Sequence, residues 1–312
     1  MENPIIVLTG PTASGKTKMS FALAKKYGGE IICADSMTVY RGMSIGTDKP
    51  TLLISDVEKK VQNPDGSYLI NGITHYLLDI LDPDQEFNAS TFKQYVEKTV
   101  ADIRSRGKIP ILVGGSLLYI DSFVYDFQMP QVQPDPKLRA QLEKKSDDVL
   151  FSQLVSLDPD AEWTIDQNNR RRVIRALEVC LKSGEPFTAQ KSKKERPNNI
   201  LYLSISRERE HLYEKINTRV DEMMEEGLLD ETKMLYQKYD HSTAMQATGY
   251  RQLLQYIEGK ICLSDAVEQT KKSHRNFAKR QLTWLRRNPD VKWIKSEAEA
   301  ESQIDTFLKE ID

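Results

Sequence analysis

The stretch "GPTASGKTKMS", residues 10–20, decides the fold of this chain. It has the spacing G-x-x-x-x-G-K-[ST], with Gly10, Gly15, Lys16 and Thr17 in place, and it follows the apolar run "PIIVL". A glycine loop between a strand and a helix offers backbone N–H groups and a helix N-terminus to anionic oxygens. We therefore expect a phosphate-binding loop, or P-loop; a tight glycine turn that binds nothing would not require Lys16 followed by Thr17. The expected loop residues are Gly10, Pro11, Thr12, Ala13, Ser14, Gly15, Lys16 and Thr17.

Short runs rich in Ile, Val and Leu recur along the chain, and helical patterns separate most of them. The runs are "PIIVLTG", "EIICADS", "HYLLDIL", "KIPILVGG" and "NILYLSIS". This alternation predicts an α/β fold, with a parallel sheet flanked by helices. Ligands of such sheets bind beyond the carboxyl ends of the strands. Those ends are the glycine loop, Asp35–Ser36, Asp79, Gly114–Ser116 and Ser206–Arg207.

The alternation of strand and helix stops after about Tyr119, and mostly helical signals follow as far as Asn199. We expect an inserted all-helical subdomain over residues 120–199, within a core formed by residues 1–119 and 200–312. Its helices are indicated by "DPKLRAQLEKK", "DDVLFSQLVSL" and "RRRVIRALEVCLKSG", the last stopping at Gly184. "NPDGSY", residues 63–68, predicts the turn of a surface hairpin.

Composition excludes several classes of protein. With 312 residues, of which 39% are hydrophobic, the chain can bury a sizeable core. No run approaches the roughly 18 apolar residues of a membrane span, and the start lacks a signal-peptide pattern, so we expect a cytoplasmic protein without membrane contact. Cys33, Cys180 and Cys262 are too far apart for a C-x-x-C zinc site and do not form a disulfide framework.

Charge is unevenly distributed, although the net charge is only −2. Between Gln269 and Pro289 there is no acidic residue. The basic residues of this run are Lys271, Lys272, Arg275, Lys279, Arg280, Arg286 and Arg287. A helix carrying them presents a basic face that can contact a polyanion, or one that is merely solvated.

A second motif, "IICADSMTVYRGMSIGTDKP", places Asp35 at the end of an apolar run. This carboxylate has two interpretations. It can be the second metal-holding residue of a nucleotide hydrolase, or a general base that takes a proton from a nucleophile attacking the phosphorylated molecule.

Seven motifs in one order resemble the bacterial tRNA dimethylallyltransferase family, also called tRNA isopentenyltransferase. They are "GPTASGKT", "DSMTVYRGMSIGTDKP", "LLDILDP", "IPILVGGSLLYI", "RRVIRALEV", "GYRQL" and "AKRQLTWLR". The resemblance implies transfer of the dimethylallyl group of dimethylallyl diphosphate to N6 of the adenine 3′ of the anticodon, position 37, in tRNAs that read codons beginning with U. It implies that the loop holds the diphosphate as a leaving group, with Mg²⁺ as cofactor.

Residue roles follow from the resemblance position by position. Residues 12–17 would contact the diphosphate, and Thr17 the metal. Asp35 would be the base, with Ser36, Met37 and Thr38 lining the adenine pocket. Ser116 stands where the family usually has Thr, and Arg219 matches an arginine that contacts the diphosphate. We therefore name Asp35, Lys16, Arg219 and Ser116 as candidate catalytic residues.

The resemblance also implies tRNA contacts spread over the chain and recognition of the anticodon stem-loop; we expect a monomer. Besides the pocket residues, the implied contacts are Arg139, Arg171, Arg172, Arg175, Gln246, Gly249, Tyr250 and Arg251. For the arginines of residues 171–175, a structural role paired with Glu178 is the alternative. For Ser116 the alternative is a strand-end cap.

The chain departs from the family pattern in a few places. Tyr76 stands where a second His is usual, and Asp166 and Gln167 stand where His-Pro is common; the region 61–72 is longer than typical. Three other functions remain open: an adenylate isopentenyltransferase acting on free AMP, ADP or ATP, a P-loop kinase, and a non-catalytic RNA-binding module. ATP binding to the loop is also physically possible.

Overall fold

The computed structural model describes residues 4–50, 60–130, 132–190, 192, 194–240 and 242–311. Its centre is one eight-stranded sheet in the order β3-β4-β5-β2-β6-β1-β7-β8. The strands are β1 (Ile5–Thr9), β2 (Gly29–Ala34), β3 (Lys60–Gln62), β4 (Tyr68–Ile70), β5 (Ile73–Tyr76), β6 (Ile109–Gly114), β7 (Ile200–Ile205) and β8 (Lys292–Ile294). The pairs from β5 to β8 are all parallel, whereas β3–β4 and β4–β5 are antiparallel. The predicted α/β fold is confirmed, with an antiparallel extension at one edge.

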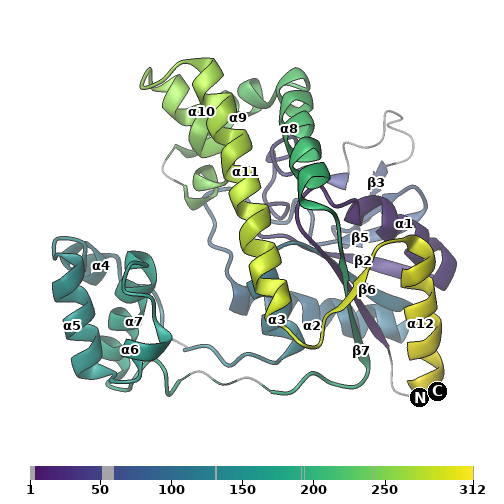
Figure 1. Ribbon diagram of the computed structural model, residues 1–312, viewed down its shortest axis with the longest axis horizontal. Helices are drawn as coiled ribbons and strands as arrows, with labels where there is room; N and C mark the ends of the chain where they lie inside the picture. Colours follow the sequence, from purple (N-terminus) through teal and green to yellow (C-terminus); the bar gives the residue numbers. More distant parts are fainter. Residues whose placement is uncertain are drawn as a thin grey trace. The chain divides into compact units, whose positions relative to one another are not determined.

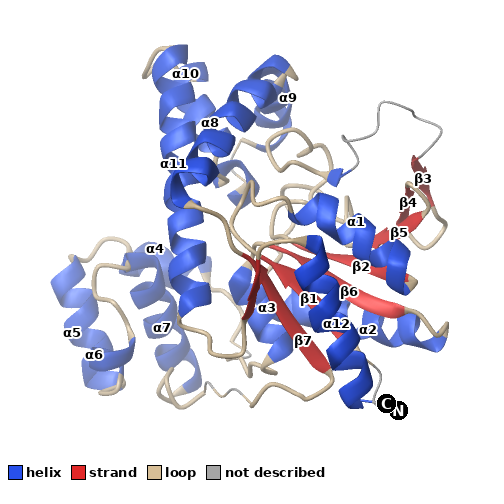
Figure 2. Cartoon of the chain, turned by 45° about the vertical axis from the view of Figure 1, so that its right-hand side comes forward, coloured by secondary structure: helices blue, strands red, loops and turns tan. Residues whose placement is uncertain are grey.

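Helices cover both faces of the sheet (Figures 1 and 2). The helices in the described part of the chain are α1 (Lys16–Tyr27), α2 (Ala89–Ser105), α3 (Leu117–Val124), α4 (Pro136–Leu142), α5 (Asp147–Leu157), α6 (Ala161–Thr164), α7 (Arg170–Ser183), α8 (Arg209–Glu225), α9 (Leu228–Tyr239), η3 (Thr243–Gln246), α10 (Tyr250–Ile257), α11 (Leu263–Arg286) and α12 (Glu297–Ile311). Helices α1 and α12 lie on one face and α2 on the other. Helices α8–α11 gather at the end of the sheet where β7 stops (Figure 1).

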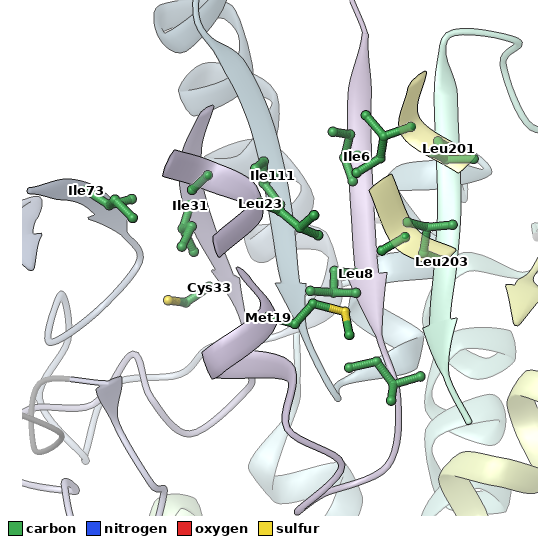
Figure 3. Packing of buried hydrophobic residues seen from close by; sticks show 14 of the residues in the cluster. Ile6, Leu8, Met19, Leu23, Ile31, Cys33, Ile73, Ile111, Leu201 and Leu203 are labelled. Atoms are coloured by element: carbon green, nitrogen blue, oxygen red, sulfur yellow. The ribbon is translucent and has the colours of Figure 1, made fainter. Parts of the chain in front are cut away.

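The core lies between the central strands and α1. Strands β1 and β7 are buried along their whole length, as expected for parallel strands covered on both faces. Leu8 of β1 and Leu203 of β7 point to the same layer as Met19 and Leu23 of α1 (Figure 3). This packing fixes α1, and therefore the loop that precedes it, against the carboxyl end of the sheet.

Two sequence predictions about strands need correction. The run "HYLLDIL" was expected to be a strand, but β5 is Ile73–Tyr76 and ends where the run has barely begun. Leu77 and Asp79 have φ values of 62° and 52°, a left-handed backbone that cannot continue a strand. The short parallel strand β8 was not expected. The hairpin turn at residues 63–68 is confirmed, because β3 and β4 flank it as an antiparallel pair.

The chain forms two compact units, one comprising Met1–Phe123 with Arg196–Asp312 and the other Val124–Glu195; the expected boundaries were 120 and 199. The regular elements in the second unit are α4–α7, around buried residues that include Leu150, Leu154 and Leu177. Asp135 caps α4 by accepting from two backbone N–H groups, and Gly184 at φ 75° ends α7. The starts and stops of these helices agree with the sequence signals.

Within the described ranges, no helix is long and apolar enough to cross a bilayer.

Candidate active site

The glycine loop between β1 and α1 is wound as a concave turn. Gly10, Ala13 and Gly15 have φ values of 149°, 60° and 93°, and the N–H of Ser14 donates to the carbonyl of Pro11 over 3.2 Å. The Ser14 hydroxyl is buried and has no hydrogen-bond partner among the described residues. Because a buried hydroxyl without a partner is costly, this atom indicates a loop shaped for a polar ligand.

Lys16, the first residue of α1, turns back over this loop. Its Nζ donates to the carbonyls of Gly10 and Pro11 over 3.0 and 2.8 Å. Burial lowers the pKa of Lys16 to about 8, although the negative charges of Asp35 and Asp48 act in the opposite direction. An anion in the loop would stabilise the charged form of the Lys16 ammonium, so the loop favours a negatively charged ligand.

Asp35 lies directly beyond the carboxyl end of β2, the strand two places from β1 in the sheet. Its Oδ1 accepts from the N–H of Met37 over 2.8 Å. Burial raises the pKa of Asp35, while the hydrogen bond from Met37 and the positive charge of Lys16 act to lower it. A carboxylate with a raised pKa beside a cationic loop has the properties of a general base.

Ser116 follows β6, which lies between β1 and β2. Its Oγ accepts from the N–H of Ser36 over 2.9 Å, and its own N–H donates to the carbonyl of Ala34. Gly114 permits this close approach, because a Cβ there would lie 1.9 Å from the Ala34 carbonyl oxygen. Ser116 therefore joins the ends of β2 and β6, and its hydroxyl lies against Ser36, the residue that follows Asp35.

Thr38 and Met37 complete this edge of the site. The Thr38 side chain is buried and its hydroxyl has no hydrogen-bond partner in the described part of the chain, whereas Met37 is half-buried. Like the Ser14 hydroxyl, the Thr38 hydroxyl is available to a ligand atom.

Arg219 of α8 is held by acidic side chains. Its guanidinium pairs with Asp48 over 2.9 Å and with Glu226 over 2.8 Å, and it also contacts Glu222. Asp48 belongs to the "GTDKP" motif, and its charge also acts on Lys16. The structure thus brings Arg219 to the segment that joins β2 to the hairpin, where Asp48 lies within electrostatic reach of the glycine loop.

Glu231 of α9 organises the same segment. Its carboxylate accepts from the backbone N–H groups of Ser44, Ile45 and Gly46, at 2.9 to 3.1 Å. It also accepts from the hydroxyl of Tyr250 over 2.7 Å. Tyr250 is fully buried, so its side chain is not available to RNA. The side chain therefore supports the segment 44–46, and the RNA contact implied for this position stays a prediction.

The candidate tRNA-binding arginines divide into two groups. Arg139 and Arg175 both pair with the fully buried Glu178, at 2.7 and 2.5 Å. For Arg175 this is the structural alternative raised from the sequence, whereas the pairing of Arg139 was not expected. Arg171 and Arg172 are exposed and have no ion pair among the described residues. Arg171 and Arg172 are therefore the arginines of this group that can reach a phosphate without breaking an existing pair.

Exposed polar and basic groups also occur around α10 and α11. Gln246 and Arg251 are exposed, while Gly249 is buried at the start of α10. On α11, Lys271 pairs with Asp221, and Arg275 donates to the side chain of Asn217. The exposed basic residues of the run are Lys272, Lys279, Arg280, Arg286 and Arg287.

The described residues contain no group of three or more His, Cys, Asp or Glu side chains that could hold a metal ion. Mg²⁺ commonly takes one or two protein oxygens and completes its shell with substrate phosphates and water. A half-buried Thr17 hydroxyl at the start of α1 fits such a site, because the remaining oxygens would come from a diphosphate.

Comparisons with known proteins identify the family of this chain. The model of the IPP transferase family matches residues 38–288. The chain belongs to the IPP transferase family. It is 42% identical over 299 residues to the tRNA dimethylallyltransferase of Bacillus velezensis, covering 94% of this chain and 90% of the relative. It is also 42% identical over 319 residues to that of Acetivibrio thermocellus, covering 99% and 97%.

Solved structures of IPP transferase relatives share the whole fold. The full-length tRNA isopentenylpyrophosphate transferase of Bacillus halodurans is 35% identical, with a TM-score of 0.71 and coverage of 99% of this chain and 98% of that one. A eukaryotic dimethylallyltransferase described as acting on tRNA is 28% identical, with a TM-score of 0.74 and coverage of 98% and 77%.

The departures from the family pattern lie in local structure. Tyr76 ends β5 and donates to Glu30 over 2.8 Å, and Asp166 accepts from the N–H of Asn168. The longer region 61–72 forms the hairpin of β3 and β4. Tyr76 and Asp166 therefore make contacts within the fold, and the longer region 61–72 extends one edge of the sheet.

Three side chains near the site were not expected from the sequence. Arg207, just after β7, donates to the carbonyl of Ser14. Glu231 holds the segment 44–46, and Gln281 of α11 contacts the glycine loop over 2.9 Å. Arg207 was named only as part of a strand end. Gln281 lies inside the motif "AKRQLTWLR", but nothing in this motif distinguishes it from its neighbours.

Proposed function

We propose that this IPP transferase transfers the dimethylallyl group from dimethylallyl diphosphate to N6 of adenine 37 in tRNAs that read codons beginning with U. The observation that carries the proposal is that Asp35, whose pKa is raised, and the glycine loop both lie at the carboxyl end of one sheet, beyond β2 and β1. The names of the relatives that match nearly the whole chain support the same activity.

The loop binds the diphosphate. Its backbone N–H groups, the Ser14 hydroxyl and the Lys16 ammonium offer donors and charge to the phosphate oxygens. As the bond between the allyl carbon and oxygen breaks, negative charge grows on the diphosphate, and Lys16 stabilises it. Arg219 adds charge once its guanidinium exchanges an acidic partner for a phosphate oxygen.

The residues that follow β2 and β6 bind the adenine and accept its proton. N6 forms a bond to the allyl carbon, the diphosphate leaves, and the proton lost from N6 passes to Asp35. The hydroxyls of Thr38 and Ser116 provide hydrogen bonds to the adenine ring. The adenine must leave the stacked bases of the anticodon loop to reach this pocket, at a cost of a few kcal/mol.

Mg²⁺ is the proposed cofactor, and Thr17 with the diphosphate oxygens would hold it. When bound, the ion supplies positive charge to the leaving group.

Contacts to the anticodon stem-loop are proposed for both units. Arg171 and Arg172 of the helical unit are exposed and have no acidic partner among the described residues, and the exposed basic residues of α11 form a second surface. Positive side chains of this kind release counterions from RNA without the cost of breaking ion pairs. Arg139 and Arg175 instead keep α7 in place through Glu178.

The proposal is tested by transfer of radiolabel from dimethylallyl diphosphate in the presence of Mg²⁺. Unmodified tRNA carrying adenines after the anticodon and free AMP or ATP are offered in parallel. Label in tRNA alone is the expected result. Label in the free nucleotide alone would assign the enzyme to the adenylate branch, and transfer of ATP phosphate without prenyl transfer would make it a kinase.

A further inference from the structure

Gln281 lies on the buried face of α11, between Ala278 and Leu285, and its side chain is 3% exposed. Its amide oxygen accepts from the backbone N–H of Thr12 over 2.9 Å, and its amide nitrogen donates to the carbonyl of Gly115 over 2.9 Å. One side chain therefore connects the glycine loop that follows β1 to the end of β6. Both polar atoms of the amide are satisfied by loop backbone.

We infer that Gln281 is a positioning residue that sets the diphosphate-binding geometry of the glycine loop, an inference that rests on the function proposed above. Thr12 is in the part of the loop that would contact the diphosphate, and its N–H lies outside the regular strand and helix. The Gln281 amide fixes the orientation of this peptide, and with it the direction in which the Thr12 side chain leaves the backbone.

Gly115 shows that the neighbouring backbone is built for this amide. A Cβ at Gly115 would lie 2.4 Å from Nε2 of Gln281, a distance that real Cβ atoms do not show. Gly115 is not among the residues with positive φ, so the backbone itself would accept alanine. An alanine here would therefore displace the Gln281 amide without straining the backbone.

Helix α11 can hold the Gln281 amide in place because it is packed against the loop at a second point. Ala278, one turn before Gln281, forms a small apolar cluster with Leu212 and Ile216 of α8, and Ala13 of the loop packs against it. The loop is thus supported from the side of α8 and α11 by an apolar contact and by the Gln281 amide. A side chain whose backbone is fixed in this way holds its hydrogen bonds with little loss of rotamer freedom.

The test compares Gln281→Met with Gln269→Met. Both glutamines are on α11, but Gln269 is exposed, so its variant carries the same chemical change without the contact. Binding of inorganic diphosphate is measured by calorimetry, together with KM for dimethylallyl diphosphate and Kd for tRNA. We expect Gln281→Met to weaken diphosphate binding and raise this KM about tenfold, with Kd for tRNA and the Gln269→Met values unchanged.

Gly115→Ala gives an independent measurement in case Gln281→Met folds poorly. It should weaken diphosphate binding to a similar extent, and the double variant should be no weaker than either single variant, because both remove the same contact. Unchanged diphosphate binding in Gly115→Ala or Gln281→Met, or additive losses in the double variant, would overturn the inference. Absence of prenyl transfer in the unaltered protein would refute the proposed function, while diphosphate binding still decides the role of Gln281.

Discussion

Replacing Asp35 with Asn removes the proposed base with little change in shape. The amide oxygen introduced by Asp35→Asn can still accept from the N–H of Met37, the 2.8 Å contact that orients the carboxylate. What is lost is the negative charge and the ability to take the proton from N6. A positioned base contributes about 10²- to 10⁴-fold to a rate, so we expect kcat to fall by that factor, equivalent to about 2.7 to 5.4 kcal/mol of transition-state stabilisation.

The electrostatic interaction between Asp35 and Lys16 also determines the pH at which the variant should be assayed. The charge of Asp35 helps to keep Lys16 protonated, so its removal lowers the pKa of Lys16 further below about 8. Measurements at a pH of about 6.5 to 7 limit the added loss from an uncharged Lys16. Single-turnover transfer of label to tRNA reports the chemical step, and calorimetry reports the binding of diphosphate and tRNA separately. Asp84→Asn, which changes an exposed acid in a turn, is the matched control.

The reasoning about Asp35 is refuted if the Asp35→Asn enzyme keeps more than about a tenth of the single-turnover rate, well above the loss expected for a positioned base. It is also refuted if the whole loss is a failure to bind tRNA or diphosphate, because a base acts on the chemical step and leaves ground-state binding largely intact.

Three further predictions follow from the same contacts. The pH profile of kcat/KM should be bell-shaped: the rate rises with pH as Asp35, whose pKa is raised, loses its proton, and falls again above a pH of about 8 as Lys16 loses its charge. A rate that does not fall above a pH of about 8 would exclude the assignment of Lys16, and a rising limb that persists unchanged in Asp35→Asn would exclude that of Asp35. Tyr250→Phe should lower the free energy of unfolding by about 1 to 2 kcal/mol, since a buried acceptor loses one donor; denaturant titration measures this, and an unchanged midpoint argues against the Glu231 contact. Changing Arg171 and Arg172 together to Gln should weaken tRNA binding and reduce the slope of log K against log salt by about 1 to 2, whereas an unchanged slope would remove them from the RNA surface.

Much of the central fold could be predicted because its signals are local. The glycine loop lies between a buried strand and a helix, and the parallel strands carry long apolar runs. The apolar pattern predicted a strand wrongly where buried residues do not have an extended backbone. Leu77 and Leu78 are buried like strand residues, yet Leu77 has a positive φ, so an apolar pattern marked a buried turn as a strand. Strand β8 has three residues, two of them exposed, which leaves no pattern to read.

The candidate site could be predicted only as far as its own motifs reach. Asp35 and Lys16 come from segments whose spacing carries meaning, and the structure places them within electrostatic reach of each other. Tyr250 illustrates the limit, because a motif match cannot distinguish a residue that touches a substrate from one that supports the segment that does. Its burial and its bond to Glu231 show that its side chain supports the segment 44–46.

The elements that support the site come from the other end of the chain. The loops that would bind both substrates follow β1, β2 and β6, but some of their backbone N–H groups are held by Glu231 of α9 and Gln281 of α11. Asp48, in one of these loops, is paired with Arg219 of α8. Each support joins residues far apart in the sequence and ends on irregular backbone that no ladder of hydrogen bonds would otherwise fix. Helices α8–α11 therefore support the loops at the carboxyl end of the sheet, apart from the RNA contacts proposed for them: without these contacts the loops would lose hydrogen bonds and an ion pair that fix the geometry on which the proposed reaction depends.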